Sequence, residues 1–263
     1  MSGVIYMKRL LLLAFAGLVL VPMSAFAADL GAPAYKAPPS PPPAPVYNWT
    51  GCFVGAGGGY GVYNVDTTSF TNTTPTSQYT TGGRGWLGQV SGGCDYQFST
   101  GNFGNWVVGA FADYEFMDLT GNHTGIGGAT EVANLKENAA WAVGGRIGYL
   151  ITPNFLTYWD GGYTQTHFDQ ANYSLLSSPS TNLGYALPGT TFDGWFLGSG
   201  FEYSFNWLVP GLFLKTEYRF SSFDSKTITD TGPLNLNLFS ESLRPYVQTV
   251  TTQLVYRFNW LGQ

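Results

Sequence analysis

The chain has 263 residues and a formal net charge of −5, and charged residues make up only 10% of it. Soluble domains carry roughly 25% charged residues, so the surface of this chain would suit lipid better than water. Aromatic residues reach 17%, and glycines number 35. Nothing in this weakly acidic composition indicates nucleic-acid binding.

The N-terminus predicts export. A Lys-Arg pair at 8–9 precedes an apolar run at 10–21, and an Ala-Phe-Ala sequence follows at 25–27. This is the pattern of a secretory signal peptide, which we place at 1–27. The apolar run is too short for the alternative, a helical anchor, which needs about 20 residues. Removal of the peptide leaves nine basic and sixteen acidic residues, a formal charge of −7.

The segment 28–46 is rich in proline and cannot form a packed core. Such a segment is extended, in the polyproline II conformation, and we interpret it as a periplasmic linker. Contact with the cell wall or with a partner is the alternative. The folded domain is then 47–263.

From Tyr47 onward the sequence alternates with a period of two. In 86–98, apolar and aromatic side chains or glycines stand at even positions, whereas Gln89, Ser91 and Asp95 stand at odd ones. Alternation over about ten residues is typical of a transmembrane β-strand. We predict eight such strands, at 49–63, 85–98, 106–117, 138–149, 155–168, 191–205, 212–223 and 244–258.

The connections between these strands alternate in length. Long stretches rich in Thr, Ser, Asn and Gly alternate with short turns, as expected if long loops are extracellular and tight turns periplasmic. Both termini then lie on the periplasmic side. The predicted loops are 64–84, 118–137, 169–190 and 224–243, and the predicted turns are 99–105, 150–154 and 206–211.

The positions of charged residues fit a wall that faces lipid. A Lys or Arg that points into lipid near the midplane costs about 2–4 kcal/mol. Some charged residues stand at the same alternate positions as the aromatic residues and would therefore face lipid. They occur only at the loop-side strand ends, at Arg84, Asp118, Asp193 and Arg244. Ten other charged residues stand at the alternate positions between the aromatic residues and are predicted to face the interior: Asp95, Asp113, Glu115, Arg146, Asp160, Glu202, Lys215, Glu217, Arg219 and Arg257.

Aromatic residues fall near both ends of the predicted strands, which is typical of two interfacial girdles. No segment after the signal peptide offers 18 uninterrupted apolar residues, so a closed barrel is the remaining way to span a bilayer. The sequence therefore predicts an all-β fold, an eight-stranded antiparallel transmembrane β-barrel. A periplasmic β-sandwich is the alternative, and the low charge and the two girdles disfavour it.

Four stretches carry a resemblance to a known family: Ala28-Asp29-Leu30 with the Pro-rich segment, Tyr47 to Gly55, Gly93 to Gln97, and Leu254 to Phe258. In these the chain resembles the small outer-membrane β-barrel proteins of alphaproteobacteria, often labelled "porin family protein". The likeness covers essentially the whole mature chain. Members usually stop at the terminal aromatic residue, whereas here 259–263 follow Phe258, which puts the position of the assembly signal in doubt.

Cys52 and Cys94 are the two cysteines, and the exported compartment is oxidising. If the first two strands pair around 64–84, the two residues fall nearly opposite each other. We consider a disulfide and a pair of lipid-facing thiols as alternatives.

The ten interior charges could line a conduit or pair with one another as a polar plug. An eight-stranded barrel is just wide enough for its own side chains, whereas an aqueous channel needs about 16 strands. The plug is therefore favoured, and each charge should have an opposite-sign or hydrogen-bonded neighbour, because an unpaired buried charge is costly.

Catalysis is not expected. A hydrolase needs a nucleophile and a base within hydrogen-bond reach, and the two histidines, His123 and His167, belong to no such motif. Their spacing supports no haem site either, and we expect no cofactor or metal.

The sequence favours a structural and surface-interaction protein in the outer membrane of a Gram-negative bacterium, with loops that meet the environment. A narrow porin for small solutes is the alternative. The expected partners are outer-membrane lipid or lipopolysaccharide and, as the resemblance implies, the barrel-assembly machinery.

Overall fold

The computed structural model describes residues 48–71, 73–124, 131–231 and 239–258. The predicted signal peptide at 1–27, the predicted linker at 28–46 and the tail at 259–263 lie outside the described residues. Among the described residues, no helix has the length and apolarity needed to cross a membrane.

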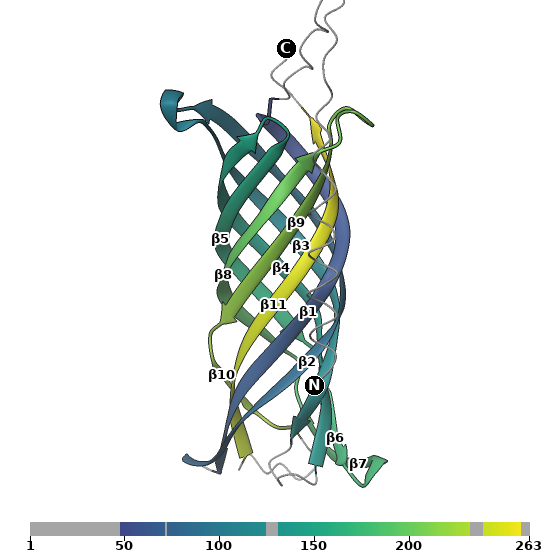
Figure 1. Cartoon of the computed structure of the whole chain (residues 1–263). Coiled ribbons are helices and arrows are strands. Elements are labelled where there is room, and N and C mark those ends of the chain that lie inside the picture. The colour runs from purple at the N-terminus through teal and green to yellow at the C-terminus, as the bar shows by residue number, and fades with distance from the viewer. Residues whose placement is uncertain (1–47, 72, 125–130, 232–238, 259–263) are drawn as a thin grey trace, which may run out of the picture. The chain divides into compact units, whose positions relative to one another are not determined.

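The described chain is all-β, with eleven strands in one antiparallel sheet, and eight of these strands form a ring (Figure 1). Short strands β6, β7 and β10 and the one-turn 3-10 helix η1 (Gly101–Phe103) stand outside the ring. The strands are β1 (Gly51–Thr71), β2 (Thr74–Ser99), β3 (Asn105–Thr124), β4 (Glu131–Thr152), β5 (Phe155–Phe168), β6 (Ala171–Leu175), β7 (Ser178–Leu187), β8 (Thr190–Ser204), β9 (Leu212–Phe223), β10 (Lys226–Thr229) and β11 (Phe239–Phe258).

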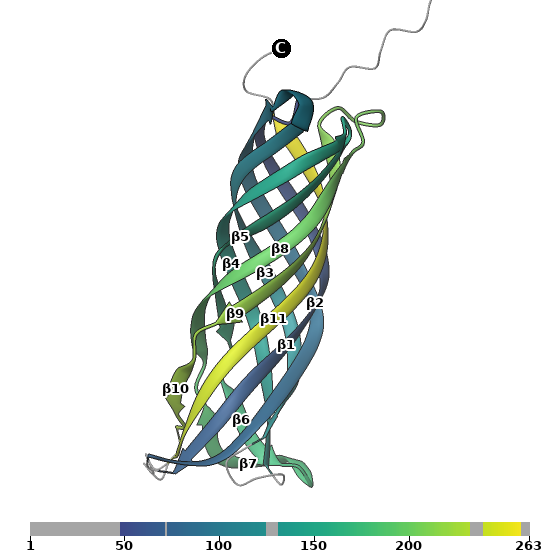
Figure 2. The same cartoon turned by 60° about the vertical axis from the view of Figure 1, so that its left-hand side comes forward.

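The ring runs β1-β2-β3-β4-β5-β8-β9-β11 and closes where β11 pairs with β1. Because Cys52 lies opposite Phe258, the start of β1 and the end of β11 share one rim, which we call the turn-side rim. The opposite rim is the loop-side rim, and β6, β7 and β10 lie there (Figures 1 and 2). The expectation of an antiparallel β-barrel is thus confirmed.

Two of the four predicted loops are wrong in large part. The 64–84 segment is almost entirely strand, since β1 and β2 stay paired as far as Thr71 and Thr74. The 169–190 segment forms the β6–β7 hairpin. In 118–137 and 224–243 the flanking strands also extend further than predicted, and β10 pairs with β11.

These segments form strands because their inward-facing residues continue the alternation. Along β1, Tyr63, Val65, Thr67 and Ser69 are all buried, while the residues between them face outward. Threonine favours strands as valine does, because its branched side chain packs well on a pleated sheet. Segments rich in Thr and Ser were therefore predicted as loops, although the hydrogen-bonded pairing of the strands continues through them.

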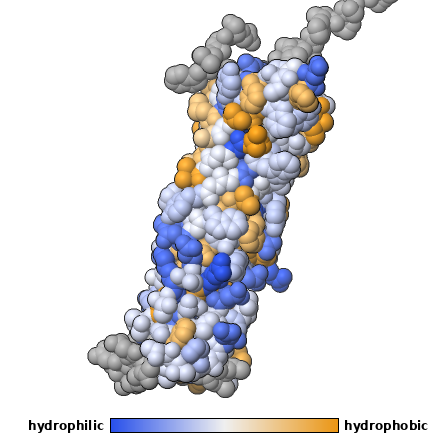
Figure 3. Space-filling model, turned by 90° about the vertical axis from the view of Figure 1, so that its left-hand side faces the viewer, coloured by the Kyte–Doolittle hydropathy of each residue, from blue (hydrophilic) through white to orange (hydrophobic). Residues whose placement is uncertain are grey.

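The outer face carries the predicted aromatic residues. Toward the loop side, Trp86, Tyr114, Trp141, Trp195 and Tyr218 are all exposed, with Trp86 at 73%. On the face seen in Figure 3, most of the hydrophobic side chains gather on the turn-side half, and hydrophilic ones predominate toward the loop side. The strands therefore continue beyond the aromatic band into a more polar region.

Candidate functional site

The ten charged residues predicted inside the barrel all face inward, and none is more than 7% exposed. They lie on seven strands of the ring, and all of them except Asp160 belong to one of two networks of ion pairs and hydrogen bonds. The networks are stacked along the interior. Aromatic side chains of one buried cluster lie against both networks, with Phe53 on Arg146 and Phe196 on Arg219, and a second apolar cluster lies toward the loop side.

The turn-side network joins four strands across the interior. Arg146 on β4 donates to Asp95 on β2, with Nε 2.8 Å from Oδ1, and to Glu202 on β8, with Nη1 2.6 Å from Oε1. Arg257 on β11 donates to the same two carboxylates. Two guanidinium groups and two carboxylates thus alternate in a closed cycle, in which each charge has two partners of opposite sign.

Aromatic rings pack on the same guanidinium groups, which sequence analysis did not foresee for an interior expected to be polar. The Arg146 Cζ lies 4.6 Å from the centre of the Phe53 ring. The Arg257 Cζ lies about equally far from three rings, those of Trp49, Phe53 and Phe213. These cation–π contacts exclude water from the cycle and strengthen its ion pairs.

The second network is centred on Arg219 of β9. Its Nη1 and Nη2 donate to both oxygens of Asp113 on β3, at 2.9 and 2.7 Å, and its Nε donates to Glu217 at 3.0 Å. Glu217 also pairs with Lys215 at 2.7 Å and accepts a hydrogen bond from the Tyr158 hydroxyl at 3.0 Å. A two-oxygen contact of this kind is the strongest arrangement available to arginine.

The interior holds more acids than bases. Among the ten predicted charges, six are acidic and four are basic. Asp160 is 5% exposed, and neither of its carboxylate oxygens has a hydrogen-bond partner. Its neighbours of opposite sign are Arg219 and Lys215, and its Oδ1 lies against Gly198.

A further polar cluster lies near the loop-side rim, and we call it the outer polar cluster. Its centre is Glu241, whose Oε2 is 2.9 Å from His123 Nε2 and whose Oε1 accepts from the Tyr79 hydroxyl at 3.0 Å and from Ser69 Oγ at 3.2 Å. His123 and Glu241 are fully buried. Sequence analysis missed this cluster because Glu241, Tyr79 and His123 all fall in predicted loops.

Asp230 lies just after β10, outside the aromatic band, and both its carboxylate oxygens are buried without a hydrogen-bond partner. Burial, and then the negative charges of Glu241 and Glu131, raise the pKa of Asp230 to about 7. Near neutral pH this carboxyl group therefore carries a proton in a large fraction of molecules, unlike an exposed aspartate.

The outer polar cluster does not have the geometry of a nucleophile and its base. Ser69 donates to Glu241 and not to His123, and the second ring nitrogen of His123 lies 3.3 Å from the Thr81 hydroxyl. His167 contacts Thr191 instead. Among the described residues, no group of three or more His, Cys, Asp or Glu could hold a metal ion.

Cys52 and Cys94 lie directly opposite each other in the β1–β2 register, and their sulfur atoms form a disulfide. The bridge lies near the turn-side rim, close to where β1 begins. It ties β1, the first strand of the ring, to its neighbour β2.

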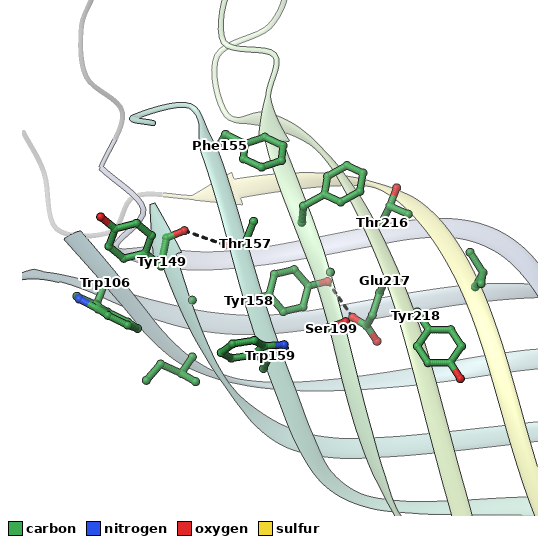
Figure 4. A pocket seen from close by; sticks show the side chains of 15 residues that line it. Trp106, Tyr149, Phe155, Thr157, Tyr158, Trp159, Ser199, Thr216, Glu217 and Tyr218 are labelled. Atoms are coloured by element: carbon green, nitrogen blue, oxygen red, sulfur yellow. Dashed lines mark hydrogen bonds between the residues drawn. The ribbon is translucent and has the colours of Figure 1, made fainter. Parts of the chain in front are cut away.

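The outer wall has a hollow of 670 Å³ in its turn-side half (Figure 4). Small residues such as Ser199 and Thr216 leave the space, and large aromatic side chains, among them Trp106, Tyr149 and Trp159, surround it. Behind the wall, Tyr158 donates to Glu217. The hollow is apolar and lies on the face predicted to contact lipid, so an acyl chain would fit it.

No protein-family model and no curated protein matches the chain. Solved structures do resemble it in fold. The outer membrane protein OprG from Pseudomonas aeruginosa is 11% identical, with 80% of this chain and 98% of OprG covered at a TM-score of 0.48. Neisserial surface protein A is 13% identical, with 80% and 98% covered at a TM-score of 0.38.

The attachment invasion locus protein Ail of Yersinia pestis is 9% identical, with 79% of this chain and 99% of Ail covered at a TM-score of 0.33. With such identities and TM-scores below 0.5, these likenesses transfer neither a function nor a location to this chain. The resemblance to the alphaproteobacterial family stays a prediction.

The turn-side network should be needed for stability. Arg146→Met leaves Asp95 and Glu202 buried with one cation between them, and loss of one partner of a buried ion pair costs about 3–5 kcal/mol. We expect the variant barrel to unfold in detergent at a clearly lower temperature. The matched control is Arg244→Met, which removes an exposed arginine from the outer face of β11. Equal unfolding temperatures for the two variants would contradict the assigned role of the network.

The disulfide can be tested by intact mass. The protein is alkylated under denaturing conditions with and without prior reduction. We expect no alkylation without reductant and two alkylated cysteines after it. Two alkylations without reductant would show that Cys52 and Cys94 are free thiols.

Proposed function

We propose that this chain is an outer-membrane β-barrel with a structural and surface-interaction role, whose interior is plugged by its own ion pairs. The location is supported by the outer face. Exposed aromatic side chains surround the barrel in a band, and the charged residues of the outer face, such as Arg84, Asp118 and Arg244, lie beyond it toward the loop side. A bilayer selects this distribution.

The observation that carries the plugged interior is the burial of the turn-side network. The side chains of Arg146, Asp95, Glu202 and Arg257 come from four different strands, and each is at most 1% exposed. A water-filled passage would hydrate charges that line it. The buried guanidinium groups, carboxylates and aromatic rings therefore support a plug, which is also what a ring of eight strands would favour.

The loop-side rim supports the surface-interaction role. The β6–β7 hairpin extends there beyond the ring (Figure 2), and its tip exposes Leu176 together with polar residues at 180–182. Binding residues tend to lie on segments of this kind that a rigid scaffold presents. The partners we propose are outer-membrane lipid or lipopolysaccharide around the wall and the barrel-assembly machinery during insertion.

An enzymatic role receives no support from the outer polar cluster, and we propose that the protein is not an enzyme. His123 and Glu241 are inaccessible, and Ser69 donates to the Glu241 carboxylate. We interpret the cluster as a set of buried polar contacts that holds β1, β2, β3 and β11 together near the loop-side rim.

Conductance distinguishes the plugged barrel from a narrow porin. The full chain is inserted into planar lipid bilayers, with a 16-stranded porin as the positive control. We expect no steady channels, because the buried networks leave no hydrated path. Reproducible current steps of constant size would promote the porin alternative and contradict the plug.

A further inference from the structure

A second hollow, of 640 Å³, lies on the outer wall toward the loop side, across β1, β2, β3 and β4. Its outward side chains form two neighbouring rows of the sheet. One row is Asn64, Gly82, Asn122 and Asn134, and the row below it, nearer the turn side, is Val62, Arg84 and Thr120. Lys136 on β4 continues the second row beside the hollow.

Glycines create this hollow. Gly82 has no side chain in the middle of the row of asparagines, so Asn64 and Asn122 flank an open space. Gly83 and Gly121 pair beside it and face the interior, where a Cβ at Gly83 would lie 2.4 Å from the buried Tyr63 ring. The absence of a side chain at Gly82 is therefore what opens the outer wall between the two asparagines.

The lining offers hydrogen bonds and one available cation. Three carboxamide side chains can each donate and accept, which suits hydroxyl groups of a sugar. Arg84 is exposed, and the structure gives it no ion pair or hydrogen bond within the described residues. Lys136, by contrast, is paired with Asp118 at 2.8 Å. An unpaired guanidinium beside several amides is suited to bind a phosphate group through two oxygens.

The position of the hollow identifies the source of such a ligand. In the row directly below Arg84, Trp86 and Tyr60 face outward with their ring centres 5.1 Å apart, and Trp86 belongs to the aromatic band. Aromatic residues of this kind mark the level of lipid headgroups. A molecule in the hollow would therefore have its polar part beside the sheet and its acyl chains in the bilayer.

We propose that this hollow binds the phosphorylated sugar headgroup of a membrane glycolipid. Arg84 binds the phosphate, Asn64, Asn122 and Asn134 bind sugar hydroxyl groups, and the acyl chains run past Trp86 toward the turn side. The inference rests on the proposed membrane location and adds a defined lipid site to it.

The test is native mass spectrometry of the full chain in detergent, with a diphosphorylated, acylated glucosamine disaccharide as the probe. We expect a one-to-one adduct that survives mild activation. Arg84→Gln should weaken binding about tenfold, since a charge-assisted two-oxygen contact is lost. Asn122→Ala should weaken it less. The matched control, Arg244→Gln, removes an exposed arginine two rows away and should change binding less than twofold.

Two further lipids separate the alternatives. The dephosphorylated glycolipid should bind about as weakly to the native chain as the probe binds to Arg84→Gln. Phosphatidylglycerol, which is anionic but has no sugar, should not displace the probe. Equal effects of Arg84→Gln and Arg244→Gln, or displacement by phosphatidylglycerol, would reduce the site to nonspecific attraction. If a correctly folded barrel retains no glycolipid, the inference fails while the proposed barrel function stands.

Discussion

The structure depends on the closure of the sheet, in which β11 pairs with β1 along nearly their whole length. A hydrocarbon environment supplies no water for unpaired N–H and C=O groups, so an open edge would be very costly there. Once eight strands close a ring, the strand count also limits the interior to a space that side chains can fill. The buried networks and the outward aromatic band are consequences of that closure.

Closure leaves many charged side chains buried in the interior of the barrel. Ten charged side chains are directed inward, where desolvation would make each of them unfavourable if it were alone. The desolvation cost is offset because Arg146 and Arg257 each pair with two carboxylates, and because aromatic rings pack on their guanidinium groups. Asp160 is the exception, since its buried oxygens have no hydrogen-bond partner.

The sequence predicted the wall better than the rims. The alternation of side chains along each strand was enough to place Asp95, Arg146 and Arg219 inside, because a one-residue shift would have exposed every charge of a strand to lipid. The long extension of β1 and β2 was missed, since Thr-rich and Gly-rich segments have the composition of loops. Contacts such as that between His123 and Glu241 could not be predicted, because they join residues 118 positions apart through a register that composition does not encode.

The most direct test of a closed barrel in the outer membrane is the electrophoretic mobility of the mature protein from outer-membrane fractions, with and without heating. A closed, hydrogen-bonded ring resists detergent until it is heated, so the account predicts a faster band in the unheated sample and recovery in the outer-membrane fraction. Unchanged mobility together with a soluble periplasmic protein would contradict the barrel and favour a sandwich.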